Sequence, residues 1–128
     1  MQAHNISFFM LKYTIRLSLF LNIAVLIPVC AGLLSDALWI ADVYGPASAA
    51  RGILLSIYGA ILIVSTALLF SRDVMLVAPL LLIQVVYKLT TPFSVGSFSN
   101  PVVISNLVIA TVHIVTLSLI VRENRHQT

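Results

Sequence analysis

Four long apolar runs dominate this sequence and restrict its fold more than any other feature. They cover about 17–34, 51–70, 74–91 and 102–121 of 128 residues. A helix needs about 20 mostly apolar residues to cross roughly 30 Å of hydrocarbon. Apolar residues make up 60% of the chain and charged residues 9%, whereas a soluble domain carries about 25% charged residues. We therefore predict an all-α membrane protein, a single domain over 1–128 that forms an antiparallel bundle of four transmembrane helices.

Local signals between the runs place the helix ends. Asp73 and Asn100 are typical N-cap residues, and Asn100 is followed by a proline, which suits a first helical turn. The third run has fourteen uncharged residues before Lys88, which span about 21 Å and are too short to cross. This helix is therefore expected to continue past Lys88 to Thr91, where Pro92 discourages continuation.

The segment between the first two runs has two interpretations. Ser35 can cap a short helix, and Gly45 can end it. Trp39 and Tyr44 carry rings that favour the headgroup region. The segment is either a short helix at the outer membrane surface or an extension of the first transmembrane helix.

Small residues recur every four positions in the second run, at Gly52, Ser56 and Ala60. They share one helix face, and such a pattern lets a neighbouring helix approach closely. We expect this face to pack against helices three and four of the same chain, with a homodimer seam as the alternative.

The basic residues predict the orientation. With the N-terminus inside, five lie on the inner side and two, Arg51 and Lys88, on the outer side; the inner five are Lys12, Arg16, Arg72, Arg122 and Arg125. The positive-inside rule then predicts that both termini are cytoplasmic. Because these charges flank apolar runs and form no soluble basic face, we expect no nucleic-acid partner.

Several functional classes lack the residues they need. Cys30 is the single cysteine, so an intrachain disulfide, a CxxC pair and a cysteine-based zinc site are excluded. None of the predicted spans contains Asp or Glu, which proton-coupled cation exporters normally require. No hydrolase, metalloprotease or P-loop motif is present. We expect no catalytic residues, no metal site and no catalysis by this chain alone. A cleaved signal peptide is the alternative for the first run, although that run is longer than a usual signal core.

Polar residues inside the spans are the candidate functional residues, because each is costly in contact with lipid. Gln84 and Lys88 lie one turn apart on one helix face, beside Tyr87, and Asn106 and His113 share a face of the next helix. Counting the rise per residue puts Lys88 and Asn106 at similar depths, about 21 and 24 Å from the inner ends of their helices. Together with Arg51, the basic residue that begins the second run, these positions predict a polar pocket. The six predicted pocket residues are Arg51, Gln84, Tyr87, Lys88, Asn106 and His113.

Such a pocket suits an oxygen-rich group, such as a quinone carbonyl or a lipid phosphate. Structural alternatives exist for each residue. Lys88 can extend to the membrane surface, Arg51 can be an outer anchor, and the amides, including Asn22, can form interhelical hydrogen bonds. A single histidine such as His113 makes no metal site and can simply be buried.

Two segments resemble a known family. They are YGPASAARGILLSIYGAIL at the start of the second run and APLLLIQVVYK in the third, which contain Arg51, Tyr87 and Lys88. With the four-helix layout, they resemble the DoxX-like small bacterial membrane proteins. The resemblance implies a compact four-helix bundle in a bacterial inner membrane, and some relatives are associated with quinone-linked oxidation. Leu89-Thr90-Thr91 follows Lys88 where the family pattern leads us to expect more aromatic residues.

Three functional hypotheses follow. The first is a non-catalytic structural or accessory module, which packs with itself or with another membrane protein. The alternative is a bundle that binds a quinone or lipid headgroup and acts as a redox accessory subunit. A channel or transporter is the third, but it needs a continuous polar path, and the inner half offers mainly Asn22.

Overall fold

The computed structural model describes residues 2–128, except for the side chain of His4, and these residues are 87% helical without strands. The helices are α1 (Gln2–Ser35), α2 (Leu38–Tyr44), α3 (Ala49–Leu69), α4 (Val77–Val95) and α5 (Pro101–Gln127), and a 3₁₀ turn, η1 (Val74–Leu76), precedes α4. Four segments are long and apolar enough to span a membrane: Asn5–Ser35, Ala49–Leu69, Val74–Val95 and Pro101–Gln127. The prediction of an all-α protein with four membrane-length helices is confirmed.

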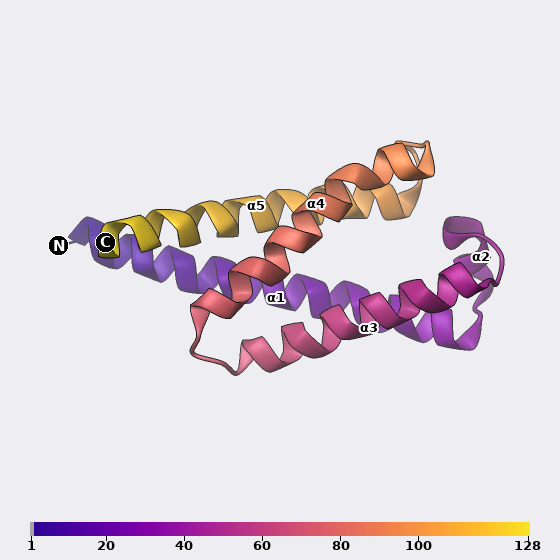
Figure 1. Ribbon diagram of the computed structural model, residues 1–128, viewed down its shortest axis with the longest axis horizontal. Coiled ribbons are helices and arrows are strands. Elements are labelled where there is room, and N and C mark those ends of the chain that lie inside the picture. The colour runs from indigo at the N-terminus through magenta and orange to yellow at the C-terminus, as the bar shows by residue number, and fades with distance from the viewer. Residues whose placement is uncertain (1) are drawn as a thin grey trace. The chain divides into compact units, whose positions relative to one another are not determined.

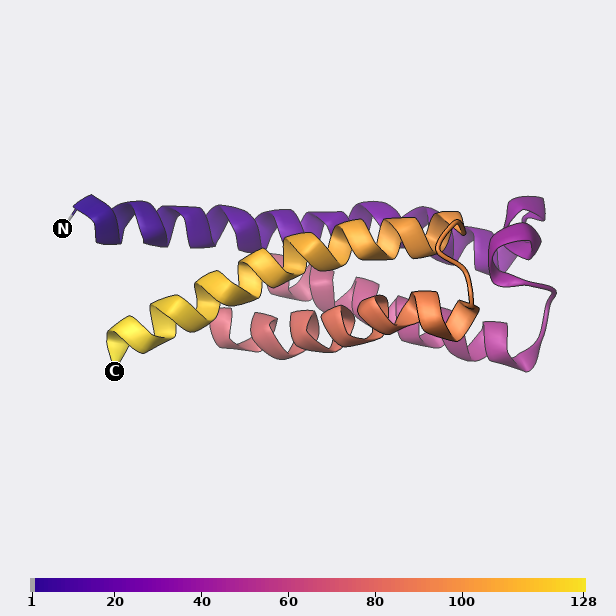
Figure 2. The same ribbon diagram turned by 90° about the horizontal axis from the view of Figure 1, so that it is seen from above.

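Contacts group the described residues into two compact units. Unit 1 contains residues 2–18 and Ser71–Thr128, and unit 2 contains Leu19–Phe70. Helix α1 contributes to both units. In unit 1, α4 and α5 run in opposite directions, are joined by a short connection and contact each other extensively (Figures 1 and 2).

Side-chain caps begin three of the helical segments, and two of these caps, Asp73 and Asn100, lie where the sequence predicts. The Asp73 carboxylate accepts from the Met75 N–H at 3.0 Å, and the Asn100 side chain accepts from the Val102 N–H at 2.8 Å. The Ser48 hydroxyl accepts from the Arg51 N–H at the start of α3. These caps satisfy N–H groups that have no partner within the helix.

Helix α1 is much longer than predicted, because it begins at Gln2 and not near residue 17. No glycine or proline occurs before Pro28 to interrupt it. Lys12 and Arg16 are exposed on its surface, so these charges do not end the helix. Its 34 residues measure roughly 50 Å, more than the hydrocarbon thickness.

Helix α4 also continues beyond the predicted end, through Pro92 to Val95. Pro92 has no N–H, so the Lys88 carbonyl four residues earlier loses its helical partner. The Thr91 hydroxyl donates to the Tyr87 carbonyl at 2.7 Å, which is a local bond in the turn before the proline. The helix ends where Gly96 takes a positive φ of 72° and donates its N–H to the Pro92 carbonyl, a conformation that favours glycine.

The segment after α1 is a separate short helix, and the alternative of a longer α1 is wrong. Asp36 adopts a positive φ of 51° and breaks α1. The predicted cap is also wrong, because Ala37 and not Ser35 precedes α2. Gly45 ends α2 as predicted, with φ 83°.

The small-residue face of α3 does not pack as predicted. Gly52, Ser56 and Ala60 are all exposed, and a Cβ added at Gly52 meets nothing within 4 Å. The buried face of α3 is formed instead by Arg51, Tyr58, Ile61, Ser65 and Leu68. This face carries polar groups that bind within the protein, and hydrocarbon penalises their exposure more than it penalises exposed glycine or alanine.

Candidate functional site

The polar centre of unit 1 lies between α4 and α5. Lys88 is 5% exposed, and its ammonium donates to Asn106 Oδ1 at 3.0 Å. The ammonium also lies 4.8 Å from the centroid of the Tyr87 ring. Lys88 is therefore buried, and the alternative in which it extends to the membrane surface is wrong. The predicted meeting of Lys88 and Asn106 is confirmed.

Thr91, which was not predicted as a site residue, completes this arrangement. Asn106 Nδ2 donates to Thr91 Oγ1 at 3.3 Å, and the Thr91 hydroxyl donates in turn to the Tyr87 carbonyl. Asn106 thus uses its oxygen for Lys88 and its nitrogen for Thr91, which fixes the orientation of the amide. Its spacing could have identified it, since Thr91 follows Lys88 by three residues and shares its helix face.

Gln84 lies one turn before Lys88 and is 1% exposed. Among the described residues, neither its amide nitrogen nor its amide oxygen has a hydrogen-bond partner. Buried polar groups are nearly always hydrogen-bonded, so an unpaired amide needs an explanation such as a bound molecule. Gln84 and Lys88 together present unused hydrogen-bonding capacity on the buried face of α4.

The other predicted site residues have different environments. His113 is completely buried on α5, and Tyr87 is partly exposed. Arg51 belongs to unit 2, where Nη2 forms an ion pair with Asp36 Oδ1 at 2.8 Å and Nη1 donates to the Gly45 carbonyl at 3.2 Å. These bonds hold the two ends of the α2 segment at the start of α3.

Two further polar pairs lie within the spans. The Ser18 and Thr116 hydroxyl oxygens are 2.8 Å apart in unit 1, and Thr116 also donates to the Thr14 carbonyl. In unit 2, Asn22 Nδ2 donates to Ser65 Oγ at 3.0 Å. The expectation that Asn22 forms an interhelical hydrogen bond is confirmed.

No family model, no curated protein and no solved structure matches this chain. The resemblance to DoxX-like proteins stays a prediction.

Proposed function

We propose that this multi-pass membrane protein binds the carbonyl oxygen of a lipid-soluble ring, such as a quinone, between α4 and α5. The observation that supports the proposal is Gln84, whose buried amide has no partner among the described residues, one turn from the buried Lys88 ammonium. In this role the chain is a redox accessory subunit, and the residues that bind the carbonyl are Gln84 and Lys88.

The donors on α4 match what a carbonyl group needs. An ammonium has three N–H donors, and Asn106 Oδ1 is the one hydrogen-bond acceptor that the described residues offer to Lys88. The Gln84 amide adds two N–H donors. A ligand oxygen between these groups would accept from both and offset the cost of burying them in a low-dielectric interior.

Depth favours a neutral carbonyl over a phosphate. Counting from Gly96 at the end of α4, Lys88 lies about 12 Å along the helix and Gln84 about 18 Å. A phosphate at that depth would leave the headgroup region with its full charge. A neutral ring that dissolves in the hydrocarbon reaches it at a smaller cost.

Extraction of the purified protein tests the ligand. We expect wild-type protein in mild detergent to retain a quinone, and Lys88→Met to lose it while keeping its helical content, because methionine fills most of the space without the charge. Leu89→Met is the matched control, since Leu89 is 43% exposed on the same helix. Wild-type protein that holds no quinone after purification and reconstitution contradicts the proposal. A phospholipid retained in its place, and lost with Lys88→Met, identifies a phosphate as the bound group.

A packing module is the second candidate function. The pairs Ser18–Thr116 and Asn22–Ser65 support it, because in both pairs polar side chains inside the spans bind each other. In that role the chain is a non-catalytic accessory subunit that associates with itself or with another membrane protein. The same extraction separates the two, since the module predicts that Lys88→Met changes stability without any change in bound small molecules.

The proposed location is a bacterial inner membrane with both termini in the cytoplasm. The distribution of Lys and Arg residues supports this orientation. A reporter that is active only in the cytoplasm should work when fused after Thr128. Activity there of a reporter that functions only in the periplasm contradicts the orientation.

A further inference from the structure

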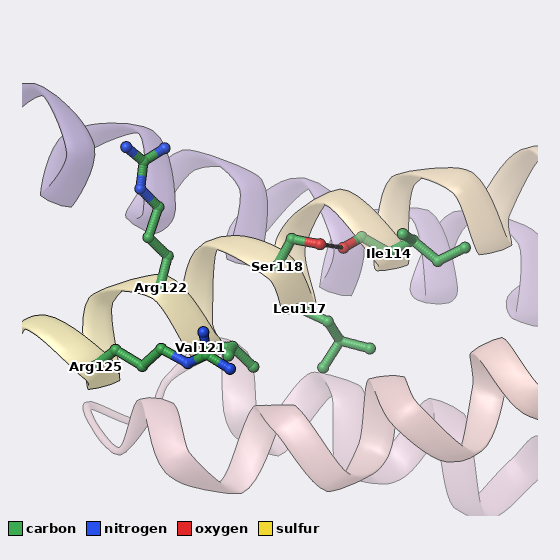
Figure 3. A pocket seen from close by; sticks show the side chains of 6 residues that line it. All are labelled: Ile114, Leu117, Ser118, Val121, Arg122 and Arg125. Atoms are coloured by element: carbon green, nitrogen blue, oxygen red, sulfur yellow. Dashed lines mark hydrogen bonds between the residues drawn. The ribbon is translucent and has the colours of Figure 1, made fainter.

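A groove runs along the C-terminal half of α5, away from the Gln84–Lys88 site. It has a volume of about 440 Å³ and is lined by Ile114, Leu117, Ser118, Val121, Arg122 and Arg125. Figure 3 shows Arg125 lying back along the helix towards Val121, whereas Arg122 extends away from the helix. Ile114, Ser118 and Arg122 follow one another every four residues, as do Leu117, Val121 and Arg125, so the six form two adjacent rows that make one stripe on the helix surface.

The stripe changes character along its length. Ile114, Leu117 and Val121 make its first part apolar, and Arg122 and Arg125 make its last part basic. The Ser118 hydroxyl donates to the Ile114 carbonyl of its own helix at 2.8 Å, so its proton is not available to a ligand. Among the lining side chains, Arg122 and Arg125 therefore supply the hydrogen-bond donors that a ligand can use.

Both arginines are exposed, and neither forms an ion pair with another described residue. Cations at a helix C-terminus interact favourably with the helix dipole, which accounts for basic residues there. It does not account for an apolar groove that continues directly from them. An amphiphile with a negative head and a hydrocarbon tail complements both parts.

We propose that this groove binds an anionic phospholipid. Its acyl chain lies against Ile114, Leu117 and Val121, and its phosphate accepts hydrogen bonds from Arg122 and Arg125. Guanidinium groups suit phosphate because they can donate two parallel hydrogen bonds. Basic pockets at the ends of membrane helices recognise anionic headgroups by this chemistry. The site is independent of the proposed function, because it shares no residue with Gln84 or Lys88.

Competition between two lipids tests the proposal. The full chain is placed in nanodiscs of phosphatidylcholine with a small fraction of phosphatidylglycerol, and the lipids that stay bound after release into detergent are identified by native mass spectrometry. We expect phosphatidylglycerol to be enriched on the wild-type protein. Arg122→Gln or Arg125→Gln should each lower this enrichment about fivefold, and the double substitution about thirtyfold.

Two further variants separate a built site from general charge attraction. Arg72→Gln removes one exposed basic residue from the turn before η1 and should leave the enrichment unchanged. Val121→Trp fills the groove, keeps both arginines and should reduce bound phosphatidylglycerol, whereas Lys88→Met should not. Equal retention of the two lipids by wild-type protein overturns the proposal. So does an Arg72→Gln loss as large as that of the double variant, or unchanged enrichment in Val121→Trp.

Discussion

Replacing Gln84 with methionine is expected to stabilise the ligand-free protein, although it removes a buried polar residue. Gln84 is 1% exposed and both of its amide atoms lack partners among the described residues. A buried unsatisfied polar group costs about 1–3 kcal/mol, so the two groups together cost about 2–6 kcal/mol. A volume-conserving change in a packed interior usually costs below about 1.5 kcal/mol. The cost of the unpaired amide groups is larger than the cost of the packing change, so the substitution should raise the free energy of unfolding by about 1–4 kcal/mol.

Thermal unfolding in mild detergent measures this change, with the folded fraction read by size-exclusion chromatography after heating. The apparent midpoint should rise by several degrees when no quinone is added. Added quinone should raise the midpoint of wild-type protein, because a ligand that binds only the folded state stabilises it. It should raise the midpoint of Gln84→Met by much less, because one of the two donors to the carbonyl is gone and only Lys88 remains.

Leu82→Met is the control, since Leu82 lies on the same helix and is 56% exposed. It should change neither the midpoint nor the response to quinone. A ligand-free Gln84→Met protein that unfolds at a lower temperature than wild type would contradict this prediction, because it would mean that the amide is already hydrogen-bonded in the resting protein.

Three other changes test the packing directly. Thr91→Val removes the acceptor of Asn106 Nδ2 and should lower the free energy of unfolding by about 1 kcal/mol; Thr90→Val, whose hydroxyl bonds only within its own helix, should change it less, and equal effects would contradict the role of Thr91. Asn22→Ala and Ser65→Ala, combined in a double-mutant cycle, should show a coupling energy of about 0.6–1.7 kcal/mol, and zero coupling would contradict their hydrogen bond. Ser56→Leu should leave thermal stability unchanged because Ser56 is exposed, and a large loss of folded yield would restore the predicted packing face.

The starts of η1 and α5 were predictable because their cap signals are local, whereas the start of α1 at Gln2 was not. Asp73 and Asn100 bond to N–H groups two residues along the chain, and such bonds depend little on the rest of the fold. The ends of the helices were harder to predict. Pro92 removes one helical hydrogen bond, but α4 continues past it and ends at Val95, where Gly96 adopts the αL conformation.

The candidate site was predictable in part. Lys88 and Asn106 lie on consecutive helices joined by a short connection, so counting the rise per residue was enough to bring them together. The ion pair of Arg51 was not predictable in this way. It depends on Asp36, whose positive φ turns the chain sharply after α1 and places the carboxylate beside Arg51. A positive φ is uncommon at any non-glycine residue, and the enrichment of Asp in that conformation is too weak to predict it at one position.

The wrong prediction for the small-residue face of α3 shows that polar residues indicate the buried face of a membrane helix better than small residues do. Glycine, serine and alanine tolerate close packing but do not require it, and the Gly52 face lies exposed. Arg51 and Ser65 require partners, and the face that contains them is buried. The same requirement places Gln84 and Lys88 on the buried face of α4. Arg51, Ser65 and Lys88 each have a partner in the described part of the chain. Gln84 is also buried, but no described residue supplies the hydrogen bonds that a buried polar side chain normally has. We therefore assign the ligand to that position.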